Sequence, residues 1–125
     1  MKKVLLDTSV IIDFLHQKNK ADTLLYKLST EDLYISIVTH TELYSGKSVW
    51  EKTRAKQELN DLFSGLTILP LVTEVSEKAG YLKATNQGTL LDCIIAATAL
   101  HHNIPLLTLN SKDFKQIKKL KLFEA

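Results

Sequence analysis

Short apolar segments that alternate with helical ones constrain this chain's fold more than any other feature. Four apolar runs bounded by polar residues predict strands, and a fifth run is a candidate edge strand, at residues 4–6, 33–37, 67–69, 105–108 and 120–123. Apolar residues at helical spacing predict helices over residues 9–16, 21–28, 39–46, 49–63, 73–85, 89–101 and 111–117. Strands that alternate with helices favour right-handed crossovers and helices on both sheet faces. The predicted fold is a three-layer α/β/α sandwich with a four- to five-stranded parallel sheet.

The composition indicates one globular domain over residues 1–125, because 45% of the residues are hydrophobic and 24% are charged. A single cysteine, Cys93, cannot form an internal disulfide and lies in an apolar run, which fits a reducing cytoplasm. Lys2 and Lys3 resemble the start of a signal peptide, but Asp7 interrupts the apolar run too early. The longest apolar run, residues 93–100, is too short to span a bilayer. We therefore expect a cytoplasmic protein with no membrane association.

The net charge of +2, from 16 basic and 14 acidic residues, points only weakly to nucleic acid. Five lysines crowd the C-terminal segment, a pattern more typical of a solvated face: Lys112, Lys115, Lys118, Lys119 and Lys121. If several carboxylates gather at one site, however, the remaining surface is more basic than the net charge suggests.

The first predicted strand ends directly on an acid, Asp7, followed by Thr8 and Ser9. In open α/β sheets, ligands bind at the carboxyl ends of the strands, which is where Asp7 is expected. The alternative is that Asp7 only caps the helix that follows, because aspartate is a favourable N-cap residue.

Three further acids each lie three residues after a hydroxyl or amide side chain: Glu42 after Thr39, Asp92 after Thr89 and Asp113 after Asn110. This spacing is typical of a capping box, and acids at helix starts also stabilise the helix dipole. Helices between parallel strands begin at the carboxyl edge of the sheet, so these three acids are also expected to converge with Asp7 in one crevice.

Converging carboxylates repel one another unless a cation or a proton neutralises them. Their hard oxygens suit Mg²⁺ or Mn²⁺, and the sequence has no Cys/His cluster with zinc spacing. Such a site predicts phosphodiester hydrolysis, because the metal lowers the pKa of a bound water. Thr8 or Ser9 would then orient that water or contact a phosphate.

Residues 5–9, Glu42, residues 92–100 and residues 107–114 resemble the PIN-domain ribonucleases, most closely the VapC-like toxins of toxin–antitoxin pairs. The resemblance covers the whole chain. It implies a Mg²⁺-dependent endoribonuclease, with Mn²⁺ as a substitute, that is dimeric and silenced by a cognate antitoxin. Relatives in this family cut particular tRNAs or rRNA loops.

The resemblance also assigns roles to the site residues. Asp7 and Asp92 would bind the metal, and Glu42 would hold the metal-bound water or act as a base. The remaining catalytic acid would be Asp113, completing the shell with Asn110, and the supporting residues would be Thr8, Ser9 and Thr108. The sequence departs from the commonest family pattern at the fourth acidic position, where Asn110 stands and Asp113 follows three residues later.

Several alternatives remain beside this hypothesis. A housekeeping PIN nuclease would process RNA without an antitoxin, and a neighbouring antitoxin gene would distinguish the two. A non-catalytic binding module could use the same fold, although intact Asp7, Glu42 and Asp92 disfavour it. A phospho-receiver domain needs an acid after the third strand, where Pro70 stands, and a haloacid-dehalogenase-type phosphatase needs an aspartate in place of Ser9.

The expected antitoxin would reach into the acidic crevice with a basic side chain, most suitably an arginine. Four apolar residues are candidates for its docking groove: Leu43, Tyr44, Val49 and Trp50. For Trp50, the alternative is that it simply packs against a neighbouring helix.

Overall fold

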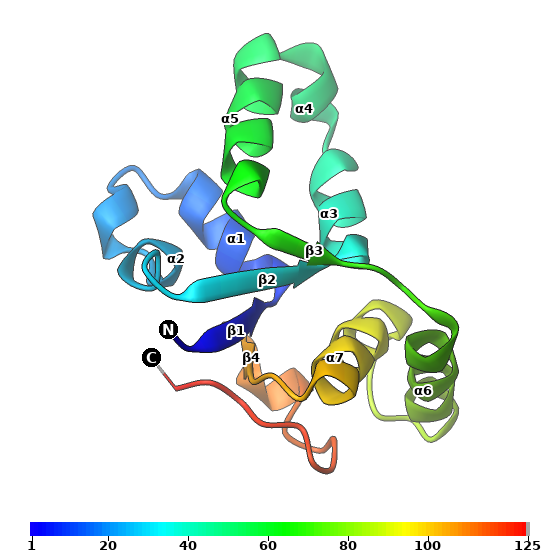
Figure 1. Cartoon of the computed structure of the whole chain (residues 1–125). Coiled ribbons are helices and arrows are strands. Elements are labelled where there is room, and N and C mark those ends of the chain that lie inside the picture. Colours follow the sequence, from blue (N-terminus) through cyan, green and yellow to red (C-terminus); the bar gives the residue numbers. More distant parts are fainter. Residues whose placement is uncertain (125) are drawn as a thin grey trace.

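The computed structural model describes residues 1–124 and has a four-stranded sheet as its central layer (Figure 1). The strands are β1 (Lys3–Leu6), β2 (Asp32–Ser36), β3 (Thr67–Leu69) and β4 (Leu106–Leu107). They pair in the order β3-β2-β1-β4, and every pairing is parallel. The candidate edge strand over residues 120–123 forms only an isolated parallel bridge between Leu122 and Leu106. The predicted α/β/α fold with a parallel sheet is therefore confirmed, with four strands.

Helices cover both faces of the sheet (Figure 1). Two helices, α6 (Thr73–Ala84) and α7 (Leu90–His102), pack on one face together with Leu5 of β1. The opposite face, onto which Val4 and Leu6 point, is covered by α1 (Thr8–His16), α2 (Leu24–Lys27), α3 (Ile37–Tyr44) and α5 (Thr53–Ser64). The short α4 (Lys47–Glu51) joins α3 to α5, and single 3₁₀ turns are η1 (Lys20–Asp22) and η2 (Ser111–Asp113).

The predicted helix over residues 21–28 is wrong as a single element, because Thr23 divides it into η1 and α2. Thr23 is 1% exposed, and its hydroxyl donates to the Lys20 carbonyl while accepting from the Tyr26 amide. Threonine hydroxyls compete with the helical hydrogen-bond pattern in this way.

The predicted helix over residues 49–63 is also divided, into α4 and α5, by extended backbone at Lys52. No proline or glycine marks the break. The break lets α4 turn back over α3, where the Trp50 indole Nε1 donates to the Tyr44 carbonyl at 2.7 Å. A tertiary contact therefore overrides local helix propensity here.

The chain order places a topological switch point at the carboxyl end of β1. The connections from β1 lead first to β2 and β3 on one side, and only later to β4 on the other. Ligands bind in open α/β sheets at such a point. Among residues 1–124, no helix is both long enough and apolar enough to cross a membrane.

Candidate active site

Asp7 joins the end of β1 to the start of α1 and is only 5% exposed. Its Oδ2 accepts hydrogen bonds from Ser9 Oγ and Thr108 Oγ1, both at 2.8 Å. Asp7 occupies the N-cap position of α1, but its side chain makes no capping hydrogen bond, so capping alone does not account for the carboxylate. Within residues 1–124 the structure gives Asp7 Oδ1 no hydrogen-bond partner, which leaves that oxygen available to a ligand.

The hydroxyls of Ser9 and Thr108 are themselves oriented by backbone amides. Ser9 Oγ accepts from the Leu109 amide at 3.1 Å, and Thr108 Oγ1 accepts from the Asn110 amide at 3.0 Å. Each hydroxyl therefore receives a hydrogen bond from the loop after β4 and gives its own proton to Asp7. This arrangement fixes the carboxylate in one orientation and ties that loop to α1.

Glu42 lies in the second turn of α3, not at its start. The helix begins at Ile37, and Ser36 Oγ caps it by accepting from the Val38 amide at 3.1 Å. The predicted capping box of Thr39 with Glu42 is therefore wrong, because Ser36 supplies the cap three residues earlier.

Thr39 instead supports Glu42 indirectly, through the hydroxyl of Thr8. The sequence did not indicate this role. It is fully buried, and its Oγ1 lies 3.0 Å from Thr8 Oγ1, which in turn donates to Glu42 Oε1 at 2.8 Å. Because the single hydroxyl proton of Thr8 is donated to Glu42, Thr39 is the donor in the bond between Thr39 and Thr8. A chain of two hydroxyls thus connects α3 with α1 and holds Glu42.

Asp92 is the third residue of α7, and Thr89 caps that helix as predicted, with its Oγ1 accepting from the Asp92 amide at 3.2 Å. Burial raises the pKa of Asp92, and the negative charge of Asp7 raises it further. A hydrogen bond with Thr89 opposes this rise in pKa, while the charges of Asp113 and Glu42 add to it. The fold therefore brings all four predicted acids into one electrostatic environment.

Asp113 lies in η2 and is exposed. The predicted helix over residues 111–117 is wrong, because the structure has only a 3₁₀ turn there, and Asn110 makes no side-chain capping bond. Phe114 and Ile117, 1% and 3% exposed, both enter the core beneath α7.

Gly88 is a second site residue that the sequence did not reveal. Its φ of +148° favours glycine, and an added Cβ would lie 3.8 Å from Asp92 Cβ and 4.0 Å from the Asp113 carbonyl oxygen. Gln116 Nε2 donates to the carbonyls of Gln87 and Asp113, both at 2.8 Å. These contacts hold the loop before α7 against η2 and so bring Asp92 close to Asp113.

The donor groups at this site are carboxylates and hydroxyls, which are hard oxygen ligands that fit Mg²⁺ or Mn²⁺ in their chemistry. Asp7 offers Oδ1, and its charge acts on the carboxyl of Asp92 in α7. Within residues 1–124, no three His, Cys, Asp or Glu side chains already stand in an arrangement that holds a metal. The carboxylates would therefore have to draw together around a cation that relieves their repulsion.

A parallel sheet with buried and half-buried acids at its switch point is the arrangement of a PIN domain, and a family model for the PIN domain matches residues 4–120. Ribonuclease VapC1 of Methanocaldococcus jannaschii is 32% identical over 127 residues, covering 98% of this chain and 88% of that protein. The chain therefore belongs to the PIN-domain family, in its VapC group.

Two solved structures support the fold assignment. The DNA-bound VapBC of Salmonella typhimurium superposes with a TM-score of 0.83 at 23% identity, covering 98% of both chains. A toxin–antitoxin complex from Klebsiella pneumoniae has a TM-score of 0.75 at 27% identity and covers 98% of this chain and 99% of that one.

Proposed function

We propose that this protein is a Mg²⁺-dependent endoribonuclease and the toxin of a toxin–antitoxin pair. The observation that carries the proposal is the set of hydrogen bonds at the carboxyl end of β1, where Ser9 and Thr108 hold Asp7, and Thr8, the next residue, holds Glu42. The charges of Asp7, Glu42 and Asp113 all act on Asp92 there. Membership of the VapC group and the ribonuclease name of its relative support RNA as the substrate. A structured tRNA or an rRNA loop is the expected target.

In this proposal each side chain has a defined task. Asp7 and Asp92 would hold the metal ion, which when bound would stabilise charge on the phosphate and lower the pKa of water. Glu42, held by Thr8, takes a proton from the attacking water. Ser9 and Thr108 keep Asp7 oriented, and Asp113 adds negative charge at the open side of the site.

Cleavage by the purified protein should require Mg²⁺ or Mn²⁺ and should stop when EDTA is added. Because water attacks the phosphorus, the products should carry a 5′-phosphate and a 3′-hydroxyl. End-specific ligation and sequencing of the RNA fragments measures this directly. Products with a 2′,3′-cyclic phosphate would show that the ribose hydroxyl attacks and would exclude this mechanism.

A groove of about 320 Å³ between α1, α3, α4 and α5 supports an antitoxin as partner. Ile12, Leu15, Leu43 and Val49 give it an apolar lining, and Glu42 of the acidic site also lines it. A peptide in this groove would bring a basic side chain to Glu42, where an arginine would pair with the carboxylate.

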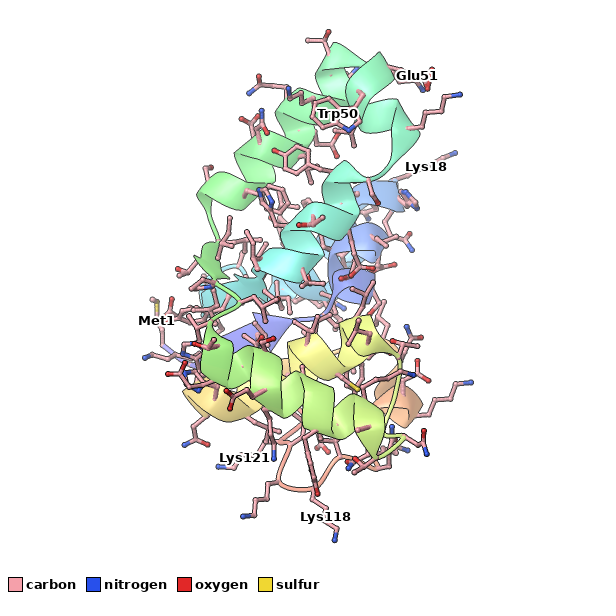
Figure 2. All side chains as sticks on the ribbon, turned by 90° about the vertical axis from the view of Figure 1, so that its right-hand side faces the viewer. Met1, Lys18, Trp50, Glu51, Lys118 and Lys121 are labelled. Carbon is pink, nitrogen blue, oxygen red and sulfur yellow. The ribbon has the colours of Figure 1, made fainter. Side chains whose placement is uncertain are left out.

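Of the four predicted docking residues, Leu43 and Val49 line this groove, whereas Tyr44 and Trp50 do not. Trp50 is 63% exposed, its ring lies 6.0 Å from that of Tyr44, and Lys56 Nζ is 4.7 Å from its centroid (Figure 2). Contact with Tyr44 and Lys56 therefore explains its position on α4.

We expect Val49→Asp to weaken antitoxin binding by about a hundredfold, because it places an unpaired charge in an apolar contact. Trp50→Ala, one residue away but outside the groove, is the matched control and should change the affinity by less than about threefold. Calorimetric titration of each variant with the antitoxin peptide measures both. A larger loss for Trp50→Ala than for Val49→Asp would place the antitoxin elsewhere.

The housekeeping nuclease remains the competing function, and an antitoxin gene beside this one would decide between them. The homodimer that the family resemblance implies is also a proposal, which sedimentation of the purified chain would test.

A further inference from the structure

A second hollow, of about 430 Å³, lies between α6, the C-terminal end of α7 and the turn at residues 118–119. It is distinct from the acidic site and from the apolar groove. Its apolar lining is formed by Ala97 and Leu100. Its polar lining is mostly basic and consists of Lys78, His101, Lys118 and Lys119, together with Asn103 and one acid, Glu74. We call it the basic groove.

The lysines of the basic groove are not neutralised by neighbouring acids. Within residues 1–124, the only ion pair closer than 4 Å joins Lys20 to Glu58, far from this groove. Lys78, Lys118 and Lys119 are all exposed, and Glu74 is the only acid in the lining. Lys121 projects from the same end of the molecule as Lys118 (Figure 2). Three unpaired charges in a hollow favour an anionic partner.

The backbone at Lys119 is an independent sign that its charge matters. Its φ of +69° lies in the left-handed region, which glycine and asparagine adopt more readily than lysine. Asn103, which lines the same groove, has a φ of +53° and is the usual residue type for this helix-ending position. A lysine at position 119 thus has a conformational disadvantage, and such residues cluster at functional sites.

The helix α7 connects the basic groove to the acidic site. Asp92 lies near its start and His101 near its end, nine residues later, which corresponds to about 14 Å along a helix. A stacked nucleic-acid strand carries a phosphate every 3.4 Å or so, hence about four phosphates over that length. The basic groove is therefore within reach of the same RNA strand.

Tyr81 adds an aromatic surface next to these charges. It is 58% exposed on α6, and Lys78 Nζ lies 5.2 Å from its ring centroid. Grooves that hold single-stranded nucleic acid combine lysines along the backbone with aromatic rings on which bases stack. We propose that the basic groove binds the phosphate backbone of the substrate RNA about four nucleotides from the cleaved bond. This inference rests on the proposed ribonuclease function.

The test measures RNA binding as a function of salt, using full-length protein with Asp92→Asn to prevent cleavage. Adding the two substitutions Lys118→Gln and Lys119→Gly to this variant should make the slope of the log binding constant against log salt concentration shallower by about 1.4 for a single strand. The control pair Lys18→Gln and Lys27→Gln removes the same charge from exposed lysines on the opposite side of the sheet and should leave the slope unchanged. Lys119→Gly should also raise the melting temperature, which separates lost binding from unfolding.

Cleavage assays distinguish failure of this inference from failure of the proposed function. With Asp92 restored, the groove variant should raise KM for an RNA of about 30 nucleotides but not for one of about four, which cannot span both sites. Equal slopes for the groove and control pairs, or equal KM changes for long and short RNA, would overturn the basic groove as an RNA site. No cleavage by the unmodified protein would instead overturn the nuclease.

Discussion

Asp7→Asn should lower the rate of RNA cleavage by about a thousandfold or more, since a metal ligand contributes several kcal/mol to stabilising the transition state. The substitution removes the charge but keeps the shape. The asparagine carbonyl oxygen can accept the same bonds from Ser9 and Thr108, so the fold should remain intact. Single-turnover cleavage of end-labelled RNA at saturating Mg²⁺ measures the loss, and circular dichroism checks the fold.

Asp13→Asn is the matched control for Asp7→Asn. Asp13 lies on the same helix, and its Oδ1 accepts from Gln17 Nε2 at 3.0 Å, away from the acidic site. It should retain normal cleavage. Cleavage by Asp7→Asn at the rate of Asp13→Asn would exclude Asp7 as a metal ligand.

The companion variant Asp92→Asn should also abolish cleavage, but it should make the metal-free protein more stable at neutral pH. Burial and the charges of Asp7, Asp113 and Glu42 raise the pKa of Asp92, so the folded state disfavours its ionised form. The stability that protonated Asp92 contributes is lost as pH rises through its folded-state pKa. In thermal melts with EDTA, the melting temperature of Asp92→Asn should exceed that of the unmodified protein by a few degrees at pH 7, and this difference should disappear in acid.

The strands and the position of the acids could be predicted because both follow from local sequence. Residues 4–6 are apolar and end on Asp7, and residues 67–69 end before Pro70, so each strand has a clear boundary. Thr89 and Asp92 have the spacing of a capping box, and the structure contains that cap. The parallel topology then places the acids at the carboxyl edge of the sheet, and this holds for each acid independently of its local backbone geometry.

The local reasons for the acids' positions could not be predicted, because they depend on contacts between distant segments. Thr39 has the right spacing from Glu42 for a cap, but Ser36 ends β2 and caps α3 first. The buried bond between Thr39 and Thr8 crosses from α3 to α1 and leaves no sequence pattern. The break at Lys52 likewise depends on where Trp50 meets Tyr44, not on any residue that disfavours helix.

Asp113→Asn should raise the Mg²⁺ concentration needed for half-maximal cleavage by about tenfold or more, because it removes a negative charge that the site presents to the cation. Asp113 is exposed, so the melting temperature should change little. Its charge reaches Asp92 across the loop that Gly88 and Gln116 hold in place.

Asn110→Ala separates a charge effect from a structural one at this unusual fourth position. The Asn110 side chain makes no capping bond to η2; the position acts through its backbone, whose amide donates to Thr108 and whose carbonyl accepts from Asp113. Alanine preserves both backbone bonds, so cleavage and its Mg²⁺ dependence should stay close to normal. Cleavage titrated with Mg²⁺ in both variants measures the difference. A normal Mg²⁺ requirement in Asp113→Asn would leave the site with three working acids, whereas a raised requirement confined to that variant would assign the fourth acidic role to Asp113.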